Sequence, residues 1–145
     1  MNKTIWFGAG AAALLAASFS FNAAAAGLPP VHDAGVASYV SGGVGDGEAQ
    51  RFKAEAAHYP LAVELFEHAG AHDEYTADAR VKIVDRAGHV VLDDRADGPF
   101  MLVRLPAGEY RVSAALGGQR LAERAVTISD QRHAKAVFVF GAHTG

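Results

Sequence analysis

The spacing of apolar and polar residues changes its period near Pro60. Before this proline, the spacing of Ala49 and Phe52 is typical of the buried face of a helix. Asp46 is predicted as the N-cap, because its carboxylate can accept hydrogen bonds from the first-turn N–H groups. Proline disfavours helix at the residue before it, so the helix is predicted from Asp46 to about His58.

After Pro60 apolar residues recur with a period of two, which predicts strands with one buried face. The run from Phe100 to Leu105 is almost wholly apolar, which predicts a strand buried on both faces or covered by the helix. Gly117 and Gly118 are predicted as a two-residue hairpin loop, since both tolerate positive φ. The predicted strands cover 61–65, 80–84, 90–92, 100–105, 109–116, 119–128 and 136–140.

About seven short strands separated by turn residues are typical of an all-β sandwich. The sequence therefore predicts a mostly β, antiparallel, seven-stranded sandwich with one short N-terminal helix. Residues 27–38 are predicted as irregular, and 27–60 as a lead-in whose helix packs on a sandwich formed by 61–145. Leu121 and Val126 have opposite parity in their strand, which predicts a bulge or twist near Glu123.

The first 26 residues have the pattern of a cleaved signal peptide. Lys3 precedes an almost uncharged stretch over 5–21, and three alanines at 24–26 form a cleavage site. We expect cleavage after Ala26, export to the periplasm or beyond, and no stable membrane span after cleavage, because no basic cluster follows.

The amino-acid composition limits the functional classes to which the chain can belong. The chain has 145 residues, of which 50% are hydrophobic and 20% charged, and this is typical of one globular domain. The net charge of −3 argues against nucleic-acid binding. With no cysteine, the chain has no disulfide, thiolate zinc site or cysteine nucleophile, so its stability depends on its core.

Three segments carry a family resemblance: 81–88, 97–100 and 105–112. In the last segment a proline and a glycine form a tight turn, and a tyrosine and a valine then point into the core. The positions that carry this motif are Leu105, Pro106, Gly108, Tyr110 and Val112. Together the segments resemble the carboxypeptidase regulatory-like domain. Residues 39–61 resemble a group of small exported proteobacterial proteins with no assigned activity.

The first resemblance implies a transthyretin-like (prealbumin-like) seven-stranded sandwich, related to the B-type repeats of collagen adhesins. Some adhesin relatives form a Lys–Asn or Lys–Asp isopeptide bond. We expect none here, because both asparagines lie in the signal segment and 135–140 contains no aspartate. Another branch hydrolyses 5-hydroxyisourate, but its C-terminal Tyr-Arg-Gly-Ser signature is missing from 138–145. Fold alone assigns no activity.

The histidines offer the main candidate chemistry. His68, His72 and Asp73 form an H-x-x-x-H-D pattern, with His58 upstream, and imidazole with carboxylate suits Zn²⁺ or Cu²⁺. Gly70 lies between the two histidines and argues against helical spacing, so solvated loop histidines are the alternative.

No pattern typical of hydrolase or metalloprotease sites is present. We therefore expect a non-catalytic exported binding or accessory domain without a cofactor, whose partner is another envelope protein. The alternative is a periplasmic metal-handling protein that uses His68, His72 and Asp73. The oligomeric state stays open.

Overall fold

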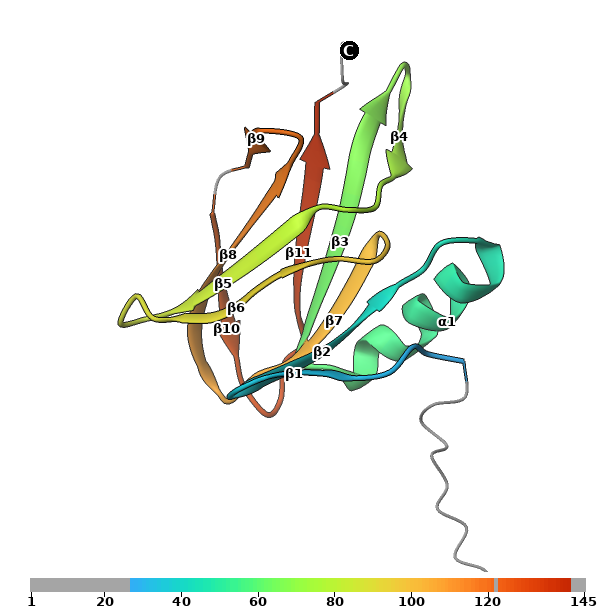
Figure 1. Ribbon diagram of the computed structural model, residues 1–145. Helices are drawn as coiled ribbons and strands as arrows, with labels where there is room; N and C mark the ends of the chain where they lie inside the picture. The colour runs from blue at the N-terminus through green and yellow to red at the C-terminus, as the bar shows by residue number, and fades with distance from the viewer. Residues whose placement is uncertain (1–26, 122, 142–145) are drawn as a thin grey trace, which may run out of the picture.

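The computed structural model describes residues 27–121 and 123–141. The expected signal peptide, residues 1–26, lies outside them. The predicted fold class is confirmed: in the described part of the chain two sheets face each other and a short helix lies on the outside (Figure 1).

Sheet A carries the helix on its outer face. Its strand order is β1 (His32–Ala34), β2 (Ala37–Gly42), β7 (Phe100–Arg104), β3 (Leu61–Ala69) and β11 (Ala134–Phe140). A short strand, β4 (His72–Tyr75), pairs with the second half of β3. β11 runs parallel to β3, whereas the other pairs of this sheet are antiparallel.

Sheet B is antiparallel. Its strand order is β10 (Arg124–Ile128), β8 (Gly108–Leu116), β5 (Arg80–Asp85) and β6 (Val90–Arg95), with β9 (Gln119–Arg120) beside the end of β8. The turn between β8 and β9 is the predicted glycine pair, and both glycines have positive φ (55° and 85°). This combination is typical of a type I′ hairpin turn.

The predicted irregularity near Glu123 is confirmed by the strand register. Arg120 lies opposite Ala115, and Arg124 lies opposite Val112. Four steps along one strand therefore match three steps along β8, so one extra residue lies between Arg120 and Arg124. This is the two-against-one count of a β-bulge.

Two sequence predictions about the strands were wrong. The described residues form eleven strands and not seven, and β1, β4 and β9 have only 3, 4 and 2 residues. Strands this short show no readable alternation. Residues 27–38 are not irregular throughout: a turn at Gly35 (φ 77°) joins β1 to β2, and β2 pairs with the central strand β7. The sandwich therefore begins at His32 and not at Leu61.

The helix begins as predicted but is capped differently. α1 spans Asp46–Glu55 and continues as a 3₁₀ turn, η2, over Ala56–His58. Gly45 is the N-cap, with φ 94°, and Asp46 is the first helical residue. Glu48 reaches back instead, and its Oε1 accepts a hydrogen bond of 2.8 Å from the Gly43 N–H. The carboxylate of Glu48 thus fixes the turn that leads into α1.

Strand β7 is buried on both faces, as its apolar sequence predicts. Met101 and Val103 point into the core between the two sheets. Phe100 and Leu102 point the other way and pack beneath α1 against Phe52. The alternation along one strand therefore joins two separate apolar clusters.

The connection from β7 to β8 carries the chain from sheet A to sheet B, and Tyr110 anchors it. Leu105, Tyr110 and Val112 are all buried in the core between the sheets, with Tyr110 7% exposed. The Tyr110 hydroxyl donates a 2.9 Å hydrogen bond to the carbonyl of Pro106, four residues upstream. A tyrosine that bonds back to the backbone at a crossover between sheets has the geometry of the tyrosine corner of Greek-key sandwiches.

We expect Tyr110→Phe to lower the free energy of unfolding by about 1 kcal/mol, because it removes one hydrogen bond and keeps the packing. Tyr110→Ala should cost about 3–5 kcal/mol, because it also opens a cavity. Urea unfolding followed by circular dichroism measures both. Equal losses for the two variants would contradict the assignment of Tyr110 to the core.

A second tyrosine links the sheets on the side where β2 meets β6. The buried Tyr39 of β2 donates a short hydrogen bond to Asp94 of β6. Next to it, the backbone N–H of Asp97 donates a 3.0 Å hydrogen bond to the hydroxyl of Ser41. Burial, and then the bond to Asp94, raises the pKa of Tyr39 above its usual range. The bond from Tyr39 lowers the pKa of Asp94.

The link should depend on pH. The lowered pKa of Asp94 means that its contribution to stability is present above the pKa of the unfolded chain and is lost as pH falls through the native pKa. We expect Tyr39→Phe to cost about 1 kcal/mol near pH 7, since Asp94 is exposed, and less below about pH 4.

Chemical unfolding of wild type and variant from pH 3 to pH 7 tests this. Tyr110→Phe is the matched control: its lost bond goes to a backbone carbonyl, so its deficit should not shrink in acid. A Tyr39→Phe deficit that stays constant down to pH 3 would rule out the ionised Asp94 as the acceptor that matters.

Candidate functional site

Helix α1 covers only part of the outer face of sheet A. Its buried residues Ala49 and Phe52 pack over β2 and β7. Figure 1 shows α1 alongside these strands, while β4 and the ends of β3 and β11 extend beyond it. We call the outward side chains of β3, β4 and β11 the open face. It consists of Glu64, Phe66, His68, Asp73, Tyr75, Lys135, Val137 and Val139.

Strand register arranges the open face in rows. Phe66 lies opposite Tyr75 on one side and Val139 on the other. Residues that oppose each other in paired strands point to the same face of the sheet. These three side chains therefore form one apolar row across three strands.

Aromatic contacts extend this row. The rings of Phe66 and Tyr75 are stacked, with centroids 4.8 Å apart, and Tyr75 also meets Phe100 at 5.1 Å. The Lys53 ammonium of α1 lies 5.4 Å from the centre of the Tyr75 ring. Tyr75 is 40% exposed and Val139 39% exposed. The row is thus packed underneath and open to solvent above.

One end of the open face holds an ion pair between the buried Glu64 and the exposed Lys135. Glu64 is 9% exposed, and within the described residues it is the only charged residue that is buried. Lys135 Nζ lies 2.7 Å from Glu64 Oε2. A carboxylate buried without a partner would be costly, so Glu64 holds the Lys135 side chain over the sheet. The pair borders a groove of about 360 Å³ that Lys53, Phe100 and His133 also line.

The other end of the open face holds His68 and Asp73, two of the three predicted metal ligands. They face each other in the β3–β4 register, with His68 Nδ1 2.6 Å from Asp73 Oδ1. His72 lies opposite Ala69, one step along the strands, and therefore points to the other face. It pairs there with Glu74 at 3.2 Å.

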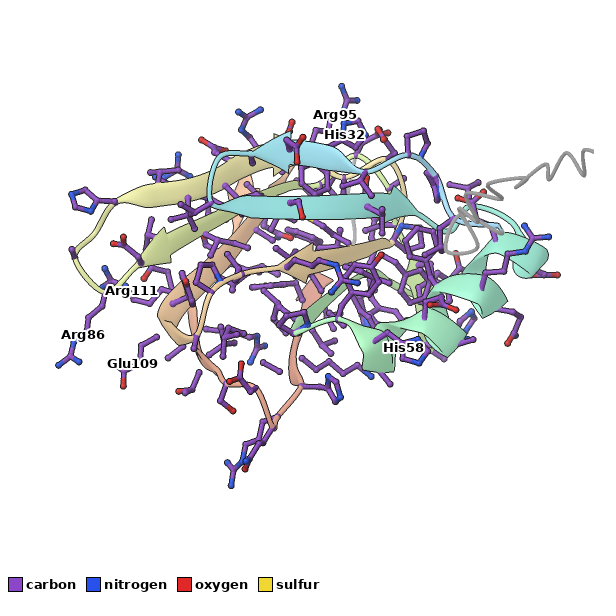
Figure 2. All side chains as sticks on the ribbon, turned by 90° about the horizontal axis from the view of Figure 1, so that it is seen from below. His32, His58, Arg86, Arg95, Glu109 and Arg111 are labelled. Carbon is purple, nitrogen blue, oxygen red and sulfur yellow. The ribbon has the colours of Figure 1, made fainter. Side chains whose placement is uncertain are left out.

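The predicted three-residue cluster therefore does not converge on one point. His58, the upstream candidate, lies at the end of η2 and pairs with Glu55 at 3.1 Å (Figure 2). Across residues 27–121 and 123–141, no three His, Asp or Glu side chains form a group that could hold a metal ion. Alternation across a two-stranded hairpin separates His72 from the His68–Asp73 pair.

The sequence analysis missed the apolar row and the Glu64–Lys135 pair. One local signal was present: Glu64, Phe66 and His68 occupy the polar parity of β3, so an aromatic residue stands where a solvated one is expected. The neighbours Tyr75 and Val139 could not be assigned in the same way. Their contact with Phe66 depends on β4 and on the parallel return of β11.

A scan against models of known protein families finds no match for this chain, and a search of curated proteins finds none either. The resemblance to the carboxypeptidase regulatory-like domain therefore stays a prediction, carried by its motifs. Among the residues that the structure describes, no helix is long and apolar enough to cross a membrane.

The geometry makes a prediction about metal ions. Two ligand side chains in an exposed pair are fewer than the three or four that zinc sites use. We expect titration with Zn²⁺ or Cu²⁺, followed by calorimetry, to show no saturable binding at micromolar metal. Saturable binding that disappears in both His68→Ala and His72→Ala would contradict this prediction and favour the metal-handling alternative.

Proposed function

We propose that this protein is a non-catalytic, exported binding or accessory domain of the cell envelope, and that it docks a partner protein on the open face of sheet A. One observation carries the proposal. Tyr75 and Val139 stay about two-fifths exposed on either side of Phe66, on a part of the sheet that α1 leaves uncovered.

The chemistry of the open face suits a protein partner. Aromatic and apolar side chains at the centre of a patch, with charged groups at its rim, are typical of interaction sites. Here the stacked pair Phe66 and Tyr75 forms the centre. Glu64–Lys135 and His68–Asp73 form the two ends of the rim. A partner that presents an apolar anchor between these ends would bury the exposed rings and leave both ion pairs at the border.

Export, the periplasmic location and the lack of catalysis are supported by the sequence alone. Export and a periplasmic location are inferred from the pattern of residues 1–26. A role without catalysis is inferred from the missing catalytic patterns and from the resemblance to regulatory-like sandwich domains. Exposed sheet faces and edges are common docking surfaces in such folds.

Val139→Glu tests the docking surface. The side chain is exposed, so the fold should tolerate the change, but a charge in the apolar row should prevent burial against a partner. Val36→Glu is the matched control: it is the same substitution at a 65% exposed valine in the β1–β2 turn.

The measurement is affinity capture from detergent-solubilised envelope with wild type and both variants, after circular dichroism has shown that all three are folded. We expect wild type and Val36→Glu to retain the same partner and Val139→Glu to lose it. Retention of that partner by all three, or capture of none by wild type across a range of salt concentrations, would contradict the proposal.

A further inference from the structure

The outer face of sheet B differs in chemistry from the open face of sheet A. Lys82 of β5 lies opposite Ser113 of β8, and Arg80 lies opposite Ala115. Ala115 also lies opposite Arg120 of β9. Opposed residues share a face, so short side chains on β8 lie between long cationic ones on both neighbouring strands.

This arrangement makes a trough along β8. Ser113 and Ala115 form part of a groove of about 290 Å³. The cationic side chains that line it are Arg80, Lys82, Arg111 and Arg120. Figure 2 shows Arg111 beside Arg86 and Glu109, on the side of the molecule away from α1 and His58. The strand residues that line the groove all belong to sheet B, so the groove is separate from the open face of sheet A.

The groove has a positive charge in a negative protein. Its lining has four cations against the two carboxylates Asp93 and Glu123, so its formal charge is 4 − 2 = +2, whereas the whole chain has −3. A local excess of one sign concentrates ligands of the opposite sign.

Two of the four cationic side chains in the groove have a carboxylate partner, and two have none among the described residues. Asp93 pairs with Arg80 at 2.7 Å, and Glu123 pairs with Arg111 at 3.5 Å. Lys82 and Arg120 form no ion pair with any residue that the structure describes. They flank the trough from opposite sides, Lys82 from β5 and Arg120 from β9. The hydroxyl of Ser113 lies in the same groove.

We infer that this groove binds a small organic anion through an oxyanion group, a carboxylate or a phosphate, held between Lys82 and Arg120 above Ser113 and Ala115. Lysine acts as a point charge and the arginine fork donates two parallel hydrogen bonds, and both suit such oxygens. The volume fits a small molecule, at the lower end of typical ligand sites. This site does not depend on the proposed docking function.

The test uses phosphate and succinate as probes for the two sources of an oxyanion, at constant ionic strength maintained with chloride. Amide chemical shifts of the ¹⁵N-labelled protein are followed during each titration. We expect at least one probe to give saturable shifts centred on Lys82, Ser113 and Arg120. A response to phosphate only indicates a phosphorylated ligand, and a response to succinate only indicates a carboxylic acid; a response to both supports a general oxyanion site.

The double variant Lys82→Gln/Arg120→Gln should lower the affinity for the probe that binds by at least about tenfold, because two charge-assisted contacts are lost. Arg132→Gln is the control, an exposed arginine in the β10–β11 turn, and should bind like wild type. Equal affinity in the double variant would overturn the site, as would the absence of saturation with both probes. Val139→Glu should leave the titration unchanged, which separates this test from the docking test.

Discussion

The structure depends on apolar packing between two sheets that no disulfide joins, since the chain has no cysteine. Strands β3 and β7 supply the centre of this contact from sheet A, and β5 and β8 from sheet B. A tyrosine reinforces it in two places: Tyr110 fixes the crossover from β7 to β8, and Tyr39 joins β2 to β6 through Asp94. Both rings are buried, and each hydroxyl has a defined acceptor. The tyrosines therefore add directional hydrogen bonds to the hydrophobic packing, which is itself non-directional.

The short length of the helix determines which surface remains for binding. α1 begins after the glycines of 42–45, and the helical segment ends before Pro60. Ten helical residues span about 15 Å, enough to cover β2 and β7 but not the whole sheet. Phe66, Tyr75 and Val139 therefore keep solvent contact on a face whose other half is sealed by Phe52.

The two outer faces of the sandwich present different chemistry for one physical reason. The longer strands of both sheets direct alternate residues to the shared core, so their remaining residues are free to differ between the sheets. On sheet A these residues form an aromatic row between two ion pairs. On sheet B they form a cationic trough over Ser113. One core thus supports two surfaces that a single substitution can change separately.

The sequence by itself determined the features that depend on neighbouring residues. These are the strand character of 61–65 and 109–116, the extent of the helix, the hairpin at Gly117 and Gly118, and the double burial of β7. Tertiary structure decided which strands became neighbours: the parallel placement of β11 beside β3, the inclusion of β1 and β2 in the sheet, and the meeting of Glu64 with Lys135. It also placed His72 on the opposite face from His68 and Asp73. Alternation and turn chemistry are local properties, whereas strand pairing and register are set by the packing of distant segments over a common core.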